Sequence, residues 1–298
     1  MSLAVQPLYR GATGLSTAFG TFGELLQGRL DEADGDFLVT LPIARWTVAT
    51  FLADPAMSTI EVRPRHKTKS LKLAQMVMQT MPKPVGGVLT LDSGLAEGKG
   101  MASSSADLVA TARAIGNALD VELTPKFIER LLCQIEPTDG VLYPGIVAYH
   151  HRSVRLRRIL GSLPSMTVVG LDEGGAVDTV AFNRIPKPFG MAEKREYARL
   201  LDRLASAVAT GDLAEVGDVA TRSAELNQVL RPKRTLKAMI GICADIDALG
   251  VVVGHSGTVI GVLIDRSTPA YPDKVAAAAK ACATLIGNVT MYSTLSFD

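Results

Sequence analysis

The chain contains 298 residues, and its 31 Lys and Arg nearly balance 30 Asp and Glu, which gives a formal net charge of +1. A near-neutral chain gives no electrostatic reason to expect nucleic-acid binding, and 5% aromatic residues argue against a stacking platform for single strands. The three cysteines are far apart and odd in number, which excludes a disulfide framework. No apolar run reaches the length of a membrane span, and no signal pattern precedes the first strand. We therefore expect a cytoplasmic protein that binds neither nucleic acid nor membrane.

The first 90 residues predict mainly strands. Glycine-punctuated residues 15–30 predict two short strands joined by a turn, and residues 37–52 predict strand structure broken at Pro42. Further strands are expected at 58–64 and 85–91, with a helix at 71–81 between them.

The next segment predicts two helices and a turn. Apolar residues recur at positions 108, 112, 115 and 119, the spacing of a buried helix face. Thr124 and Pro125 suit a helix start, and this helix should stop near Glu136 and Pro137. Residues 138–140 (Thr-Asp-Gly) form a turn signature.

The remaining residues predict a second α+β half. Strands are expected at 167–171 and 289–295, helices at 191–210, 213–229, 236–249 and 272–286, and a strand-turn-strand unit at 250–265. The natural division lies near residue 160, giving domains at 1–160 and 161–298.

A serine-rich loop at residues 98–107 (GKGMASSSAD) carries the clearest chemical signal. Backbone N–H groups at a helix start lack internal partners, and small residues allow a phosphate to approach them. The candidate phosphate ligands are Lys99, Gly100, Met101, Ala102, Ser103, Ser104 and Ser105. The spacing fits neither the Walker loop nor the dinucleotide fingerprint, and an ordinary helix cap is the alternative.

Three motifs in order resemble the GHMP superfamily of galactokinase, homoserine kinase, mevalonate kinase and phosphomevalonate kinase. They are residues 20–28 (GTFGELLQG), the serine loop, and residues 254–258 (GHSGT). The resemblance implies an α+β fold with an N-terminal left-handed βαβ domain that binds ATP and a C-terminal ferredoxin-like domain. Ala102 stands where this family has glycine before its serines.

The pairing of residues 23–28 (GELLQG) with residues 136–140 (EPTDG) looks like the L-threonine kinases of propanediol utilisation and cobalamin biosynthesis. This resemblance implies ATP-dependent phosphorylation of the L-threonine hydroxyl to O-phospho-L-threonine. The alternatives are a kinase for homoserine or another small alcohol, and a catalytically silent relative that binds a metabolite and regulates a partner. Both kinase alternatives imply a small-molecule substrate. The oligomeric state stays open, with a homodimer as one alternative.

The resemblance also implies residue roles. Asp139 is the candidate catalytic carboxylate that accepts or orients the hydroxyl proton, although its turn could also be an ordinary one. Ser104 is the expected Mg²⁺ ligand, with Ser103 and Ser105 as secondary candidates. The second ligand is either Glu129 or Glu136.

The first and third motifs carry the remaining candidates. Glu24 and Thr21 lie where the family contacts substrate, and Glu24 could pair with an ammonium or simply face water. Gly254, His255, Ser256 and Gly257 form the third-motif turn. Arg10, Arg29 and Arg45 are alternative partners for a substrate carboxylate.

Overall fold

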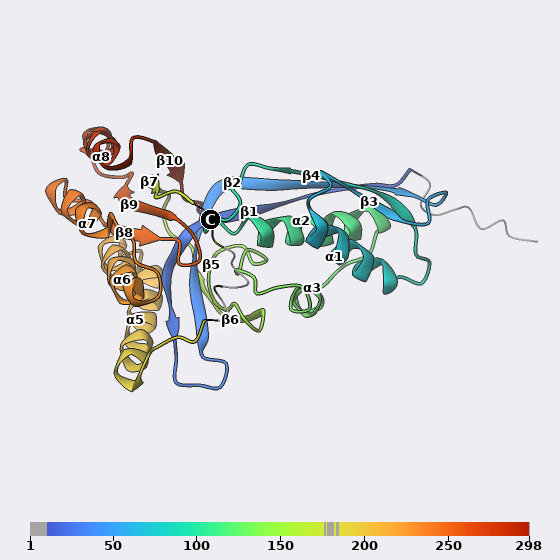
Figure 1. Cartoon of the computed structure of the whole chain (residues 1–298), viewed down its shortest axis with the longest axis horizontal. Helices are drawn as coiled ribbons and strands as arrows, with labels where there is room; N and C mark the ends of the chain where they lie inside the picture. Colours follow the sequence, from blue (N-terminus) through green and yellow to red (C-terminus); the bar gives the residue numbers. More distant parts are fainter. Residues whose placement is uncertain (1–10, 176, 178–181, 183–184, 298) are drawn as a thin grey trace, which may run out of the picture.

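The computed structural model describes residues 11–175, 177, 182 and 185–297, so Arg10 lies outside the described residues. A long antiparallel hairpin of β1 (Thr13–Arg29) and β2 (Asp36–Asp54) runs along the elongated molecule (Figure 1). The other elements up to residue 161 are β3 (Ile60–Arg63), α1 (Thr68–Gln79), β4 (Gly86–Ser93), α2 (Ser103–Leu119), α3 (Pro125–Leu132), β5 (Ile146–His150) and β6 (Arg155–Gly161).

The hairpin corrects two expectations. Residues 13–29 form one strand rather than two, and β2 passes through Pro42 without a break. The β1–β2 pairing shifts register on both sides of the Thr21–Pro42 pair. The ladder is therefore irregular at the position where proline has no backbone N–H to donate to the neighbouring strand. The glycines therefore bend a continuous strand, and they do not end it.

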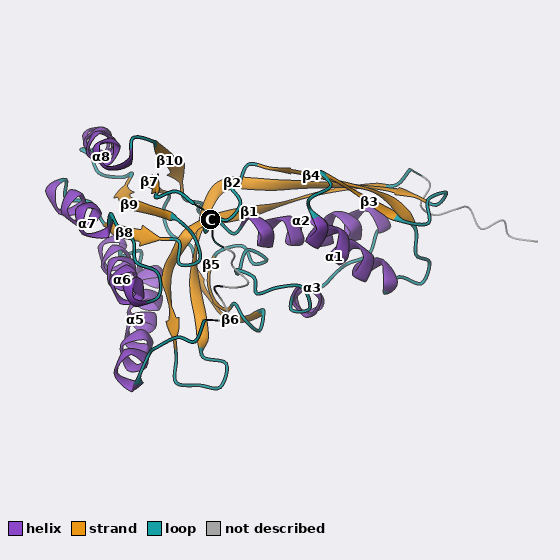
Figure 2. Ribbon diagram, in the orientation of Figure 1, coloured by secondary structure: helices purple, strands orange, loops and turns teal. Residues whose placement is uncertain are grey.

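The N-terminal half is built on a βαβ unit. Strands β3 and β4 are parallel, with α1 between them in sequence, and β4 pairs with β2. Helices α1, α2 and α3 lie on one face of these strands (Figure 2). Helix α2 is buried along nearly its whole length, because its small and aliphatic residues allow it to pack closely on β1 and β2.

The C-terminal half has a ferredoxin-like arrangement, as expected. Its antiparallel strands lie in the order β10-β7-β9-β8, and helices connect them in the pattern βαββαβ. The elements are β7 (Met166–Asp172), α5 (Met191–Thr210), α6 (Leu213–Leu226), η1 (Asn227–Val229), α7 (Leu236–Asp245), β8 (Gly250–Val253), β9 (Val259–Asp265), α8 (Tyr271–Ile286) and β10 (Val289–Ser293). Helix α7 ends four residues before the expected boundary.

The two halves share a sheet and a core. Glu24 of β1 pairs with Val253 of β8, which joins the strands of both halves into one sheet. The main hydrophobic cluster likewise crosses residue 160, with Phe37 of β2 packed edge-on against Tyr197 of α5. A smaller cluster lies within the C-terminal half. The domain boundary at residue 160 remains a prediction.

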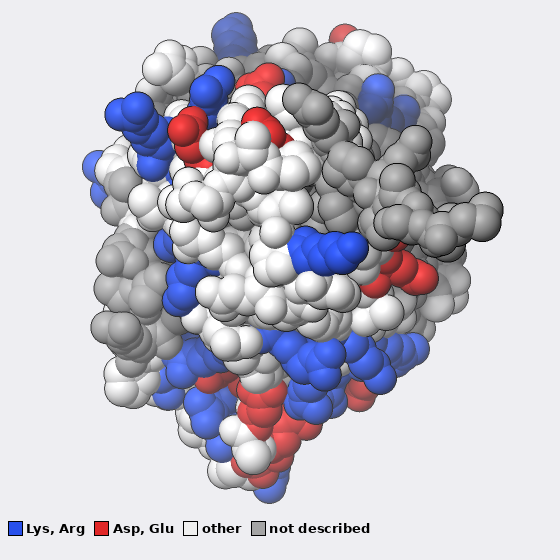
Figure 3. Space-filling model, turned by 90° about the vertical axis from the view of Figure 1, so that its right-hand side faces the viewer, with Lys and Arg blue, Asp and Glu red and all other residues white. Residues whose placement is uncertain are grey.

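The surface and helices add two observations. On the face shown in Figure 3, the middle is largely uncharged, and Lys and Arg side chains gather with Asp and Glu toward its lower part. Among the described residues, no helix combines the length and apolar character needed to cross a membrane.

Candidate active site

A cavity of about 280 Å³ opens at the start of α2, beside the serine loop. It is lined by residues 66–70, 97, 98, 100–105, 107, 136, 137, 139, 177 and 256. The lining joins the serine loop, the turn that carries Asp139 and one residue of the third motif. A larger groove of about 730 Å³ among α5, α6, α7 and β8 contains none of the predicted site residues.

The first motif is hydrogen-bonded to the serine loop. Gly23 N donates to the carbonyl of Gly100 at 3.0 Å, and Thr21 N donates to that of Met101 at 3.2 Å. Gly23 has φ +57°, and a Cβ there would lie 2.1 Å from the Val253 oxygen, so glycine is required. The Thr21 side chain is buried, and its hydroxyl has no hydrogen-bond partner among the described residues.

The third motif packs on the other side of the same loop. Thr258 N donates to the Lys99 carbonyl at 3.0 Å, and a Cβ on Gly257 would lie only 2.0 Å from that oxygen. The Lys99 ammonium is directed elsewhere: its Nζ lies 2.6 Å from Asp172 Oδ2 and 2.6 Å from the Gly175 carbonyl. Lys99 is not among the residues that line the cavity, so its backbone belongs to the loop and its side chain to a separate ion pair.

The serine loop enters α2 through a left-handed residue. Ala102 is the N-cap with φ 55°, and no side chain caps the helix. Ser103, Ser104 and Ser105 form the first turn, where backbone N–H groups lack intrahelical partners and the helix dipole is positive. Because all three serines line the cavity, this helix start can hold an anion.

Two carboxylates face the serines across the cavity. Ser104 Oγ donates to Glu136 Oε1, and Lys69 Nζ forms an ion pair with Glu136 Oε2. Ser105 Oγ lies 3.4 Å from Asp139 Oδ2 and accepts the Asp139 backbone N–H at 3.0 Å. Adjacent serines of one helix turn therefore hold Glu136 and Asp139 side by side.

Asp139 has an environment suited to proton transfer. Burial raises its pKa to about 7, and the charges of Glu24 and Glu136 add to the rise. Burial also raises the pKa of Glu24 to about 7. A carboxyl group that titrates near neutrality is matched to general-base work.

Glu24 is held by the third motif and does not face water. Its Oε2 accepts the His255 backbone N–H at 3.1 Å and lies 2.5 Å from His255 Nδ1. Burial lowers the pKa of His255 well below its usual value, which favours the neutral ring. His255 therefore positions a buried carboxylate, a role that its turn sequence alone did not indicate. Ser256 lines the cavity, and Gly254 packs beside Gly100.

The donor set at Ser104 fits Mg²⁺, which takes few protein oxygens and keeps its other positions for phosphate and water. A serine hydroxyl and the Glu136 carboxylate meet there. Glu129 lies elsewhere, where it accepts the Tyr143 hydroxyl at 3.0 Å and the Leu156 N–H at 2.8 Å. Those bonds give Glu129 a structural function, and the geometry favours Glu136 as the ligand. The described residues contain no cluster of three or more His, Cys, Asp or Glu side chains that could cage a metal.

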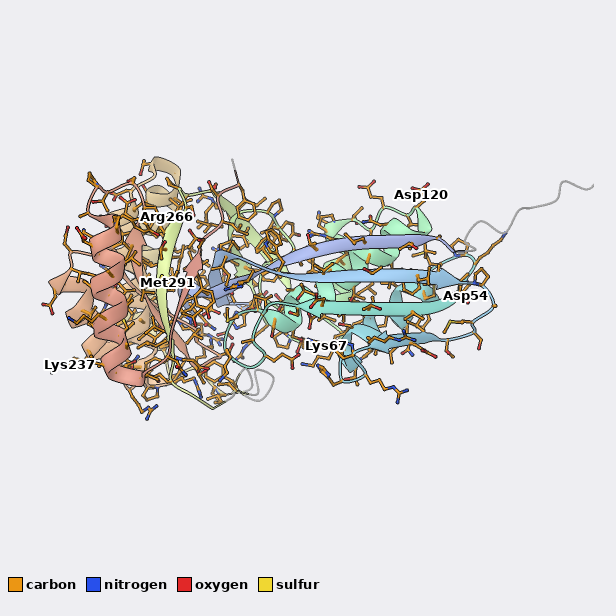
Figure 4. All side chains as sticks on the ribbon, turned by 90° about the horizontal axis from the view of Figure 1, so that it is seen from above. Asp54, Lys67, Asp120, Lys237, Arg266 and Met291 are labelled. Carbon is orange, nitrogen blue, oxygen red and sulfur yellow. The ribbon has the colours of Figure 1, made fainter. Side chains whose placement is uncertain are left out.

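Sequence reasoning missed the two lysines at the start of α1 that line the cavity. Lys67 Nζ lies 2.6 Å from Asp107 Oδ2, and Asp107 Oδ1 accepts the Thr47 hydroxyl at 2.8 Å. Lys67 lies nearer the C-terminal half than Asp54 and Asp120 do (Figure 4). Lys69 pairs with Glu136. A basic stretch in sequence resembles a solvated loop, and only the fold brings it to the serine loop.

Comparison with known proteins places the chain in a family. The profile described as GHMP kinases N terminal domain matches residues 69–143, and GHMP kinases C terminal matches residues 204–283. L-threonine kinase of Citrobacter freundii is 26% identical over 82% of this chain and 84% of its own length. L-threonine kinase of Salmonella typhimurium is 26% identical over 82% and 80%, respectively.

Solved structures agree on the fold. Homoserine kinase from Cytophaga hutchinsonii superposes with a TM-score of 0.75 at 16% identity, covering 99% of this chain and 98% of that one. L. major mevalonate kinase in complex with R-mevalonate gives 0.72 at 17% identity, covering 98% of each chain. From both profiles and these likenesses, the chain belongs to the GHMP kinase superfamily and is a phosphotransferase with an alcohol group as acceptor.

Proposed function

We propose that this enzyme transfers the γ-phosphoryl group of ATP to the hydroxyl of L-threonine, forming O-phospho-L-threonine and ADP. The observation that carries the proposal is the placement of Asp139, which lines the cavity and is hydrogen-bonded to Ser105 in the first turn of α2. The matched L-threonine kinases support the choice of threonine among small alcohols. Cobalamin biosynthesis and propanediol utilisation are the pathways in which we expect this reaction to serve.

The reaction needs positioning and charge neutralisation more than covalent chemistry. The N–H groups at the start of α2 would hold the phosphates, and Ser104 with Glu136 would hold Mg²⁺, whose charge offsets that of the phosphates. Asp139 accepts the hydroxyl proton as the threonine oxygen bonds to the γ-phosphorus and the bond from that phosphorus to the bridging oxygen breaks. The electron pair of that bond leaves on ADP.

The Glu24 carboxylate favours an amino acid over a neutral alcohol as the substrate. It is buried, lies close enough to Asp139 to raise the pKa of that group, and is fixed by His255. Two carboxyl groups this close repel each other when both are ionised, and a substrate ammonium would offset that repulsion in addition to the charges of Lys233 and Lys187 near Glu24.

A coupled ADP-release assay tests the proposal. We would compare L-threonine, L-serine, L-homoserine and mevalonate at equal ATP and Mg²⁺. We expect L-threonine to give the highest kcat/KM. Turnover with L-threonine no greater than without substrate would refute the proposal, and preference for homoserine would transfer it to the alternative kinase. No turnover with any hydroxylated compound would support the catalytically silent alternative.

A further inference from the structure

Four charged side chains meet at the end of the β1–β2 hairpin, away from the serine loop. We call Arg29, Asp36, Arg152 and Lys187 the Asp36 cluster. Arg29 Nη1 and Arg152 Nη1 each lie 3.2 Å from Asp36 Oδ2, and Lys187 Nζ lies 4.0 Å from Asp36 Oδ1. Three cations thus surround one buried carboxylate.

The cluster leaves a cation unsatisfied inside the protein. The Lys187 side chain is only 2% exposed, and its ammonium has no hydrogen-bond partner among the described residues. Arg152 Nε is likewise buried without a partner. Buried charges are normally paired and hydrogen-bonded, because desolvation otherwise costs several kcal/mol. The excess positive charge therefore indicates a missing anion.

The charges near Lys187 relate this anion to the candidate active site. Its charge interacts with Glu24 as well as with Asp36, and burial lowers its pKa to about 8. Arg152 follows His151, whose carbonyl accepts the Thr138 N–H at 3.0 Å, so this segment adjoins the turn of Asp139. Between the two sides, Gln27 is buried with its Oε1 unpartnered.

The opposed charges suit a zwitterion. The Glu24 carboxylate interacts electrostatically with both Asp139 and the Lys187 ammonium, so carboxylates for a substrate ammonium and a cation for a substrate carboxylate occur in one region. We propose that Lys187, supported by Arg152 and Asp36, binds the α-carboxylate of the substrate and makes the enzyme select hydroxy-amino acids over uncharged analogues. This inference rests on the proposed function and adds a specificity-determining residue to it.

The arginines considered from the sequence fit this task less well. Arg29 is engaged with Asp36 and acts through it. Arg45 is exposed and lies over the Tyr292 ring, with Cζ 5.9 Å from the ring centre. Nothing in the Ile-Pro-Lys-Pro sequence around Lys187 indicates that this lysine is buried.

The test compares L-threonine with L-threoninamide, which keeps the hydroxyl and ammonium but lacks the carboxylate charge. We expect the wild type to favour L-threonine by at least about 30-fold in kcat/KM, the scale of a buried charge pair. Lys187→Met should lower kcat/KM for L-threonine by a similar factor, mainly through KM, and change that for L-threoninamide less than about 3-fold. Lys194→Met is the matched control, since Lys194 pairs with Asp31 nearer the surface and should leave both substrates unchanged.

Each result decides between the two proposals. Equal loss of both substrates in Lys187→Met, or a wild type that uses both equally, would overturn the carboxylate assignment while leaving threonine phosphorylation intact. A wild type that phosphorylates only uncharged alcohols would instead refute the proposed function. If Lys187→Met does not fold, the wild-type comparison of the two substrates decides.

Discussion

Replacing Asp139 with asparagine should separate catalysis from stability in this enzyme. The substitution keeps the shape of the side chain and its contact with Ser105 but removes the partly buried, ionisable oxygen. Loss of a general base typically lowers turnover by about 10²-fold or more, and ATP binding should change little because the start of α2 is intact. The free protein should nevertheless become more stable.

The stability gain follows from proton linkage. The pKa of Asp139 is raised from 3.8 to about 7 in the folded protein, so between these values the folded state binds more protons than the unfolded state. Stability is therefore lost as pH rises from about 4 to about 7. At 1.36 kcal/mol per pKa unit, the cost above pH 7 is on the order of 4 kcal/mol, an upper bound because Glu24 titrates in the same range.

The assay combines turnover with thermal melts of the ligand-free protein at pH 5 and pH 8. Asp139→Asn should melt several degrees above wild type at pH 8, with a smaller gain at pH 5. Asp120→Asn, at the exposed C-cap of the same helix, should change neither turnover nor the pH dependence of melting. Unchanged turnover would remove Asp139 from the mechanism, and a lower melting temperature at both pH values would refute the linkage argument.

Three further predictions follow from the site. Glu136→Gln should raise the Mg²⁺ concentration needed for half-maximal turnover at least about 10-fold. Glu129→Gln should lower the stability of the protein without changing that Mg²⁺ concentration, and an equal increase in both variants would contradict the assignment of Glu136 as the ligand. Gly257→Ala should lower kcat/KM for ATP at least about 10-fold, because the added Cβ would clash with the Lys99 carbonyl oxygen of the serine loop. Gly241→Ala is the control: among the described residues no neighbouring atom lies near this position of α7, so in urea unfolding the variant should be more stable than wild type by about 0.5–1 kcal/mol. Ala102→Gly should change the free energy of unfolding by less than about 1 kcal/mol, because relief of the left-handed backbone conformation offsets the loss of a buried methyl group. Ala102→Val should lower the free energy of unfolding by more, and a valine variant as stable as wild type would argue against strain at this position.

Much of the fold was predictable because its signals are local. The helix that begins at Thr124 and Pro125 appears as α3, capped by the Thr124 hydroxyl. The strand-turn-strand unit after Gly250 appears as β8 and β9. Strands β5 and β6 were missed because they form through long-range pairing, β5 with β2 and β6 with β5, and have little periodicity of their own. The continuity of β1 was missed because glycines that bend a strand resemble those that end one.

The candidate site, like the fold, has a part that could be predicted from the sequence and a part that could not. The serine loop and Asp139 could be found because their spacing follows a family pattern and local turn chemistry. Lys69, Asp36, Arg152 and Lys187 could not, because their significance comes from ion-pair partners more than 30 residues away. No sequence window contains that information. The same holds for the contact between Glu24 and His255, which are 231 residues apart.

The shared sheet and core have a consequence for how this enzyme could change over time. Because β1 packs against α5 and α6 as well as α2, neither half would have a complete hydrophobic core when separated from the other. Recombination that exchanged the C-terminal half for that of a relative would have to match Phe37, Gly28 and Tyr197 across the junction at once. New acceptor specificities are therefore more accessible through single substitutions around the cavity, such as at position 187, than through exchange of whole modules.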